Sequence, residues 1–220
     1  MFKGQVEQDK FVVNVLQNKK NGIFLEIGSN DPIRINNTYV LEKNYNWKGI
    51  MIEYSNEWLS DYKKYRPNSI PIINDATKID YKNLFETYDI PLNIDYLQID
   101  LNAENGSTLN TLIKLDNEVM NKYKFATITF EHDYKEGLYH LPLVKETRIR
   151  SREIFKKRGY ICVFEDIHPE QGPQYVFEDW YVHPDLVDMN YINILRNKNI
   201  NNYVSNKITG KSINYKSIEY

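Results

Sequence analysis

Residues 24–32 read FLEIGSNDP, an apolar run that stops at Gly28 and continues in small polar residues. Ile23–Ile27 has the length and apolar content of a buried strand, and residues 28–31 are typical of a turn. Gly28 allows the backbone to approach a ligand closely, and the polar residues after it can present amide groups and side chains to that ligand. This segment therefore predicts a strand with a binding loop at its carboxyl end.

The same pattern, a short apolar run followed by a helical repeat, continues along the chain. Strands are predicted at residues 23–27, 48–53, 69–73, 94–101, 125–130, 160–165 and 176–182. Helices are predicted at residues 5–18, 37–45, 56–65, 81–88, 107–115 and 148–158. Strands that alternate with helices predict an α/β fold, with a mostly parallel sheet of about seven strands and helices on both faces.

Composition predicts a single soluble domain. The chain has 220 residues, of which 41% are hydrophobic and 26% charged. We assign residues 1–190 to this domain, and residues 191–220, which are rich in Asn and Lys and lack a clear period, to a polar C-terminal extension.

Charge and cysteine content restrict the partners and the compartment. A formal net charge of -2 gives no basic surface for a nucleic acid, so no nucleic-acid partner is expected. No apolar run is long enough for a membrane span, the N-terminus lacks the pattern of a signal peptide, and Cys162 is the single cysteine. These features predict a cytoplasmic protein, and they leave its oligomeric state open.

Polar residues follow each of the first five predicted strands. In open α/β sheets, ligands bind at the carboxyl ends of the strands, so these residues are candidates for a common site. The alternative is that they lie in ordinary solvated loops. The candidates are Glu26, Gly28, Ser29, Asn30, Asp31, Glu53, Tyr54, Ser55, Asp75, Ala76, Asp100, Leu101, Asn102, Glu131, His132 and Asp133.

The first loop argues against a dinucleotide. A pyrophosphate site of the Rossmann type has the spacing G-x-G-x-x-G, whereas this loop has a lone glycine, Gly28. Glu53 ends the second strand, where a carboxylate can accept both hydroxyls of a ribose. Asp75 and Ala76 end the third strand and can flank a purine. The pattern favours a nucleoside ligand without phosphates.

The segments FLEIGSND, NNTYVLEKNYNWKGIMIE, NDATKID and IDYLQIDLNAENGSTLNTL together resemble the FkbM-type class I methyltransferases. The resemblance implies a Rossmann-like fold, S-adenosylmethionine (SAM) as cofactor, and methyl transfer to a hydroxyl, often of a sugar or glycan. It adds Asn37 and Thr38, at the start of the second helix, and Leu101 to the cofactor-binding candidates. The chain departs from the family pattern I-D-V-E-G, because residues 99–104 read IDLNAE, so Asp100 alone carries over there.

Methyl transfer to a hydroxyl requires a base and close alignment of the acceptor. His132 is the first candidate for the base, because an imidazole is basic near neutral pH, and Asp100 is the second. In an alternative version Asp100, Glu131 and His132 hold Mg²⁺ or Mn²⁺, which would acidify a bound hydroxyl.

The late segment FEDWYVHP pairs two carboxylates with aromatic rings, a combination that sugar sites use. Glu178, Asp179 and Trp180 are therefore candidates for the acceptor site, with Asn102, Glu131 and Asp133. Alternatively, Trp180 is a core residue. The series Arg148, Arg150 and Arg152 can contact an anionic acceptor or can form the charged face of a helix.

Three functions remain open from the residues and the resemblance. The first is a SAM-dependent O-methyltransferase that acts on a sugar or glycan hydroxyl. The second is an enzyme that uses NAD or a nucleotide sugar with an irregular first loop. The third is a catalytically inactive cofactor-binding module of a glycan-synthesis assembly.

Overall fold

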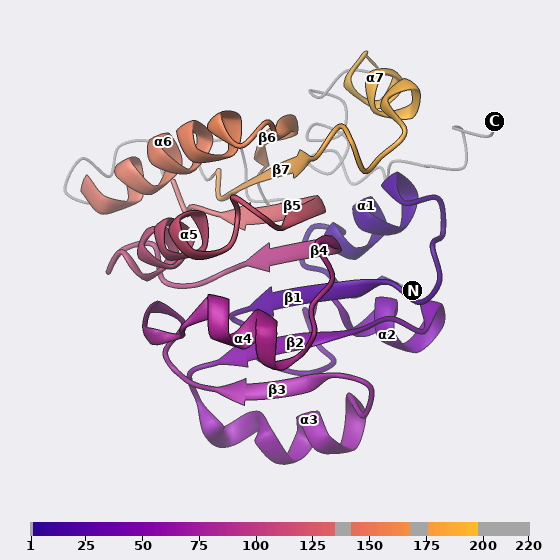
Figure 1. Ribbon diagram of the computed structural model, residues 1–220, viewed down its shortest axis with the longest axis vertical. Coiled ribbons are helices and arrows are strands. Elements are labelled where there is room, and N and C mark those ends of the chain that lie inside the picture. Colours follow the sequence, from indigo (N-terminus) through magenta and orange to yellow (C-terminus); the bar gives the residue numbers. More distant parts are fainter. Residues whose placement is uncertain (1, 135–141, 168–175, 198–220) are drawn as a thin grey trace.

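Seven strands form one sheet in the order β3-β2-β1-β4-β5-β7-β6 (Figure 1). The computed structural model describes residues 2–134, 142–167 and 176–197. All neighbouring pairs from β3 to β5 are parallel, whereas β7 runs antiparallel to both β5 and β6. The strands are β1 (Ile23–Ile27), β2 (Lys48–Glu53), β3 (Ile70–Ile73), β4 (Asn93–Ile99), β5 (Lys124–Glu131), β6 (Ile161–Ile167) and β7 (Glu178–Val182).

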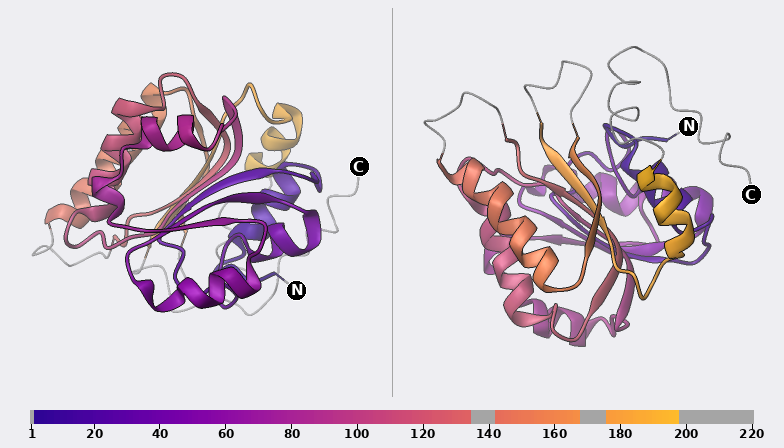
Figure 2. Two further views of the ribbon diagram at one scale, coloured as in Figure 1. Left: turned by 60° about the horizontal axis from the view of Figure 1, so that its bottom comes forward. Right: turned by 90° about the horizontal axis from the view of Figure 1, so that it is seen from above.

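Helices cover both faces of this sheet (Figure 2). One hydrophobic cluster joins the sheet to α4, α5 and α6, and the other joins it to α1, α2, α3 and α7. The helices are α1 (Gln8–Val15), α2 (Tyr39–Tyr45), α3 (Leu59–Tyr65), α4 (Tyr81–Thr87), α5 (Ser107–Glu118), α6 (Pro142–Lys157) and α7 (Met189–Asn197), with short 3₁₀ turns at Asn56–Trp58 and Ala76–Lys78. In the described residues, no helix has the length and hydropathy needed to cross a membrane.

Successive side chains of a strand point to opposite faces of the sheet, so the position of a residue along its strand determines the face on which its side chain lies. Phe24 of β1 and Tyr96 of β4 belong to the cluster with α1, which we call the α1 face. Phe130 of β5 and Tyr181 of β7 belong to the cluster with α6, which we call the α6 face.

The predicted fold is confirmed, including all seven strands and the mostly parallel sheet. One boundary needs correction. Helix α7 buries Tyr191, Ile192 and Leu195 against the sheet, so the domain continues past the predicted boundary at residue 190. The helical pattern of α7 is hard to detect in the sequence, because its apolar stripe is narrow and lies among Asn and Arg residues. Residues 198–220 lie outside the described part of the chain.

Candidate active site

Gly28 lies where β1 passes beside the end of β4. Its φ of 84° is in the left-handed region, and its amide donates to the carbonyl of Ile52 at 2.9 Å. A Cβ atom added here would lie 1.7 Å from the carbonyl oxygen of Asp100. The glycine is therefore required by backbone packing between β1 and β4, which brings the first loop and Asp100 together.

Replacing Gly28 with alanine is expected to lower the free energy of unfolding by roughly 3 kcal/mol, the sum of left-handed strain and a forced backbone shift. Gly159→Ala is the matched control, because Gly159 has a φ of 83° and nothing within 4 Å of the added Cβ atom. The control should lose about 1 kcal/mol. Urea unfolding of both variants measures the difference, and equal losses would contradict the packing argument.

A buried polar network fixes the loop between β1 and α2. Thr38 Oγ1 donates to Glu26 Oε2 at 2.9 Å, and Arg66 donates to Thr38 Oγ1 at 2.6 Å and to Asn36 Oδ1 at 2.9 Å. Arg66 also forms a buried ion pair with Glu42 at 2.8 Å. Burial raises the pKa of Glu26, which lies in β1 just before the binding loop. Glu26 and Thr38 therefore hold the loop in place, and Glu26 also lines a cavity.

Glu53 lies between the first two loops of the predicted site. One carboxylate oxygen accepts the amide of Asn30 at 2.8 Å, and the other accepts the amide of Ser55 at 2.9 Å. Each carboxylate oxygen has a further lone pair, so two acceptor positions remain. Asn30 is also fixed from behind, because the Tyr62 hydroxyl donates to its carbonyl at 2.5 Å.

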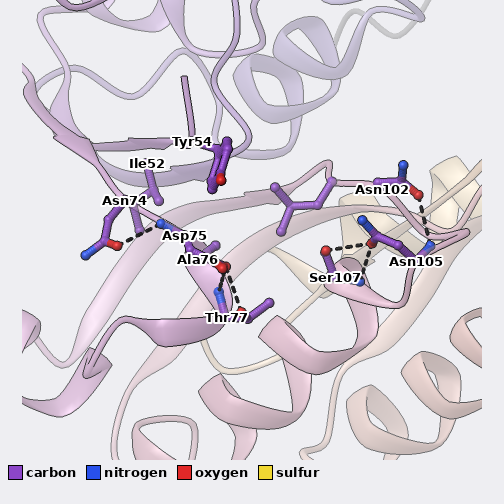
Figure 3. Close-up of a pocket in the computed structure, with 10 residues that line it drawn as sticks. Ile52, Tyr54, Asn74, Asp75, Ala76, Thr77, Asn102, Asn105 and Ser107 are labelled. Carbon is purple, nitrogen blue, oxygen red and sulfur yellow. Dashed lines mark hydrogen bonds between the residues drawn. The ribbon is translucent and has the colours of Figure 1, made fainter. Parts of the chain in front are cut away.

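The first cavity lies beyond the ends of β2, β3 and β4 (Figure 3). Its volume is about 390 Å³, within the range of small-molecule sites. Tyr54 stands on its rim with 78% of its surface exposed, and Ile52, Ala76 and Leu101 supply apolar walls. The polar lining residues are Asn74, Asp75, Thr77, Asn102, Asn105 and Ser107.

Short hydrogen bonds order the polar side of this cavity. Asp75 Oδ1 accepts the amide and the hydroxyl of Thr77 at 3.0 and 2.7 Å, and Asn105 Oδ1 accepts the Ser107 hydroxyl at 2.6 Å. The result is a shallow pocket with an aromatic rim, apolar walls and fixed polar atoms. Such a pocket can hold a flat heterocycle.

The second cavity has a volume of about 510 Å³, and its lining includes Asn30, whose amide donates to Glu53. It contains the first loop, and its floor includes Gln98 and Asp100 of the β4 end. It is lined by Gln5, Glu26, Gly28, Ser29, Asn30, Asp31, Arg34, Ile35, Asn36, Asn37, Trp58, Gln98 and Asp100. The structure thus brings most of the predicted cofactor residues to two adjacent cavities.

Asp100 and Glu131 form a carboxyl pair at the ends of β4 and β5. Ile99 pairs with Phe130 in register, so the next residues leave the two strands side by side. The two carboxyl groups share a hydrogen bond. Burial raises the pKa of Asp100 to about 6, and burial with the charges of Asp100 and Asp133 raises the pKa of Glu131 further. Both carboxyl groups are therefore stronger bases than ordinary carboxyl groups.

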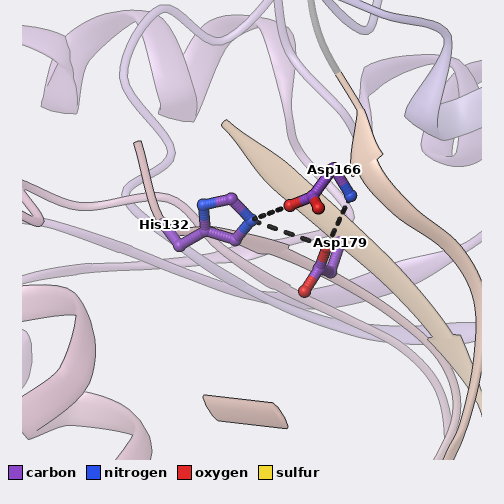
Figure 4. Close-up of side chains that lie close together, drawn as sticks. All are labelled: His132, Asp166 and Asp179. Atoms are coloured by element: carbon purple, nitrogen blue, oxygen red, sulfur yellow. Dashed lines mark hydrogen bonds and ion pairs between the residues drawn. The ribbon is translucent and has the colours of Figure 1, made fainter. Parts of the chain in front are cut away.

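The structure does not bring His132 to this pair. Because successive side chains point to opposite faces of the sheet, Glu131 lies on the α1 face and His132 on the α6 face. The imidazole of His132 is fully buried there (Figure 4). His132 Nε2 lies 3.5 Å from Asp179 and 3.8 Å from Asp166, while Nδ1 accepts the amide of Tyr134. This arrangement assigns the proton of the neutral ring to Nε2, facing the two carboxylates. His132 therefore lines neither of the two cavities described above.

The predicted metal ligands Asp100, Glu131 and His132 are likewise not gathered. Among the described residues, the potential ligands that converge are His132, Asp166 and Asp179. Their carboxylates already face cations, since Arg148 and Arg152 both donate to Asp166 and Arg152 donates to Asp179. A divalent ion would lie beside two guanidinium groups, so this cluster does not fit a metal.

The segment of β7 also differs from its predicted role in acceptor binding. Trp180 is fully buried on the α1 face and packs against Phe11 and Phe164. This matches the alternative interpretation of Trp180 as a core residue. Asp179 is fully buried on the α6 face, where Arg152, the Tyr181 hydroxyl and the Asp166 amide donate to it. Neither residue lines the first or the second cavity.

Glu178 has the opposite parity to Asp179 and points to the α1 face. It is 2% exposed, and its carboxyl accepts from Gln8 at 3.1 Å and from the Trp180 indole. Burial raises its pKa to about 8. Glu178 lies opposite Glu131 in register, so it stands behind the carboxyl pair rather than at the surface of a cavity.

Arg152→Met is expected to destabilise the protein by about 3 kcal/mol or more, because it leaves the buried Asp179 carboxylate without its cation. Burial raises the pKa of Asp179, but hydrogen bonds from His132 and Arg152 outweigh it and lower the pKa in the folded state, so this stabilisation is present above about pH 4 and is lost as the pH falls further. Arg150→Met is the control on the same helix, since Arg150 makes only exposed ion pairs and should change stability by under about 1 kcal/mol. Denaturant unfolding of both variants at pH 7 and pH 3.5 tests the size of the loss and its pH dependence. Equal losses of unfolding free energy in Arg152→Met and Arg150→Met at pH 7 would contradict the argument.

Several lining residues were absent from the sequence-based candidates. Arg34 and Ile35 lie in the loop between β1 and α2, Gln5 in the turn before α1, and Trp58 in the 3₁₀ turn Asn56–Trp58, and the sequence does not define how these segments meet at one cavity. The side-chain amide of Asn36 is fixed by Arg66. Gln98 carried a usable signal, because a polar residue inside an otherwise apolar strand needs a partner.

Solved structures of similar fold include several methyltransferases, whereas no protein-family model and no curated protein matches the chain. A proposed methyltransferase from Streptococcus mutans in complex with SAH (S-adenosylhomocysteine) has a TM-score of 0.52 at 12% identity, with 83% of this chain and 99% of that chain covered. A proposed rRNA methylase from Clostridium thermocellum has a TM-score of 0.52 at 12% identity, with 83% of this chain and 98% of that chain covered. A proposed methyltransferase from Haloferax volcanii, solved with its activator Trm112, has a TM-score of 0.51 at 11% identity, with coverage of 80% and 88%. At this identity the likeness establishes the fold: the chain has the Rossmann-like fold of class I SAM-dependent methyltransferases.

Proposed function

We propose that the protein is a SAM-dependent O-methyltransferase of the FkbM type that methylates a hydroxyl of a sugar or glycan. The observation that carries this proposal is the Glu53 carboxylate, which accepts the amides of Asn30, in the lining of the second cavity, and of Ser55, next to Tyr54 of the first cavity, and keeps two free acceptor positions. A nucleoside that extends into a polar amino-acid tail matches this arrangement. The FkbM-like sequence segments supply the acceptor class.

The cofactor is then placed across the sheet edge. The adenine lies in the first cavity beside Tyr54 and Ala76, and the ribose hydroxyls bind Glu53. The methionine part lies in the second cavity along Gly28, Ser29 and Asn30. The single glycine is sufficient because this ligand has no pyrophosphate.

The carboxyl pair of Asp100 and Glu131 is the proposed base. The acceptor oxygen attacks the methyl carbon in line with the sulfonium, the new C–O bond forms, and the C–S bond breaks with its electron pair going to sulfur. The hydroxyl proton passes to the ionised carboxylate of the pair. An elevated pKa suits this role, because a carboxylate with a pKa of about 6 is a stronger base than an ordinary one and is still ionised at neutral pH.

A small-molecule or glycan acceptor fits this transfer site better than a nucleic acid. Asp100, Glu131 and Asp133 place negative charge where the acceptor would bind, and Arg34, which lines the second cavity, is paired with Asp31 at 2.7 Å. A polyanion would be repelled from such a surface.

The test is transfer of radiolabel from methyl-labelled SAM to a panel of free sugars and oligosaccharides, with base hydrolysis to separate ethers from esters. A stable labelled ether is the expected product. Tight SAH binding without any labelled product would favour the inactive binding module, and a thermal shift with NAD or UDP-glucose alone would favour the other enzyme class.

A further inference from the structure

The three tryptophans of the chain differ in burial and in hydrogen bonding. Trp47 is 1% exposed, and its indole N–H donates to the carbonyl of Lys19 at 2.8 Å. Trp180 is fully buried, and its indole N–H donates to Glu178. Trp58 is only partly buried, and among the described residues its indole N–H has no hydrogen-bond partner. Trp58 therefore keeps a free donor, which a ligand can use.

Trp58 has a fixed position at the wall of the second cavity. Part of its ring packs against the hydrophobic cluster of the α1 face, and the side chain also lines the cavity. The 3₁₀ turn that carries it is capped by Ser55, whose hydroxyl oxygen accepts the amide of Glu57 at 3.3 Å. The result is an aromatic surface that is supported by the core on one side and open to the cavity on the other.

Ile35 lines the same cavity in a conformation that isoleucine rarely adopts. Its φ of 51° is in the left-handed region, which is an outlier for a β-branched residue, and 69% of its surface is exposed. The loop is held on both sides of it, because Asp31 Oδ1 accepts the amides of Ile33 and Arg34 at 2.9 Å each and Asn36 Oδ1 accepts a buried guanidinium at 2.9 Å. Neither the strain nor the exposure stabilises the fold, which points to a role in binding.

We propose that Trp58 and Ile35 form an acceptor subsite, in which a pyranose ring of the acceptor packs its C–H face against both side chains and one of its hydroxyls accepts the Trp58 indole N–H. This inference rests on the proposed function and adds residues that select its acceptor. A sugar ring suits the pair because it combines an apolar face with hydroxyl oxygens. Trp58 thus takes the part in sugar binding that the sequence predicted for Trp180.

The cofactor leaves these two side chains to the acceptor. In the placement proposed above, the adenine contacts Tyr54 and Ala76 in the first cavity, and the methionine part, which is polar, follows the first loop from Gly28. An apolar surface with one free donor does not match an ammonium or a carboxylate. Asp100, a member of the proposed base, lines the same cavity as Trp58, so a ring held there lies in the cavity where the transfer takes place.

The test is titration of the protein, with and without saturating SAH, with the methyl pyranosides of D-galactose, D-glucose and D-mannose. Sorbitol, which has hydroxyls but no ring, is the control ligand. Tryptophan fluorescence reports contact with Trp58, because the other two tryptophans are buried, and isothermal titration gives the affinity. At least one pyranoside is expected to change the emission in a saturable way, whereas sorbitol should leave it unchanged.

Variants of the two side chains give the matched comparison. Trp58→Ala should weaken pyranoside binding by about tenfold or more, and Trp58→Phe, which keeps a ring face and loses the N–H donor, should be intermediate. Ile35→Asn should weaken it severalfold and yet raise the melting temperature by about 2–4 °C, because Asn tolerates the left-handed region. Leu92→Asn is the control, since Leu92 is 52% exposed and lines neither the first nor the second cavity. SAH affinity should stay within about twofold in all four variants.

The outcomes separate this inference from the proposed function. Pyranoside binding that depends on Trp58 and Ile35 but gives no methylated product supports the inference and counts against methyl transfer to a sugar. If SAH does not bind, the proposed function fails, and the titrations without SAH decide the inference. It is overturned if no pyranoside binds, if both Trp58→Phe and Ile35→Asn bind like the unmodified protein, or if SAH affinity falls as much as pyranoside affinity. Should Trp58→Ala fail to fold, these two milder variants decide.

Discussion

Replacing Glu53 with alanine is expected to weaken SAH binding by about 100-fold or more, because each of the two ribose hydrogen bonds to the charged carboxylate contributes about 1.5–3 kcal/mol. Two effects add. The ribose hydroxyls lose their acceptors, and the amides of Asn30 and Ser55 lose the carboxylate that aligns the two loops.

The measurement is isothermal titration with SAH, supported by the thermal shift at saturating ligand. Glu53→Gln keeps one acceptor oxygen and should give an intermediate affinity. Glu57→Gln, four residues along, is exposed and should bind like the unmodified protein. If Glu53→Ala binds SAH within twofold of the unmodified protein, Glu53 does not hold the ribose.

Neutralising the carboxyl pair is expected to remove about 10²- to 10⁴-fold of the turnover, which is the usual contribution of a general base. Each single variant, Asp100→Asn or Glu131→Gln, still has one carboxyl group and should lose less. The double variant Asp100→Asn/Glu131→Gln has none, while its SAH affinity should stay within about threefold of the unmodified protein, since each group is replaced by an amide of the same shape.

The pH profile gives the sign of this effect. Burial raises the pKa of Asp100 to about 6, and the base must be ionised, so kcat/KM should fall as the pH drops through about 6. The hydrogen bond from Glu131 lowers the pKa of Asp100, so in Glu131→Ala the inflection should move to higher pH.

Stability should move in the opposite direction to turnover. A carboxyl group whose pKa is raised in the folded state destabilises the protein above that pKa, so at pH 7 the double variant should unfold at a higher temperature than the unmodified protein. A double variant with normal turnover, or with a lost fold, would remove the pair from its proposed role. His132→Asn is the informative comparison, because its ring is buried on the other face and its loss should lower stability more than turnover per folded molecule.

The sheet and the cofactor loops were predictable because their signals are local. Ile23–Ile27 and Lys48–Glu53 are short apolar runs with polar ends, and parallel strands bring their carboxyl ends to one edge. Gly28 and Glu53 follow directly from that rule. The tight contact between Gly28 and the Asp100 carbonyl was not predictable, because it depends on how two distant strands pack.

The acceptor end was harder to predict because consecutive residues point to opposite faces. Glu131 and His132 look like one cluster in the sequence, yet parity separates them, and Glu178 and Asp179 are divided in the same way. Applying the alternation to each strand end would have grouped Glu131 with Asp100 and Glu178, and His132 with Asp179. The Arg152 and Asp166 partners of that second cluster come from α6 and β6, far along the chain, and the sequence gives no signal for their position.

The central claim is that the first and second cavities together hold one nucleoside cofactor without phosphates. Isothermal titration of the unmodified protein with SAH, NAD and UDP-glucose tests it most directly. The account predicts one SAH site per chain with a dissociation constant in the range of about 1 μM to 1 mM that is typical of enzyme ligands, and no binding of NAD or UDP-glucose at the same concentrations. Absence of SAH binding at millimolar concentration, or binding of NAD in its place, would contradict it.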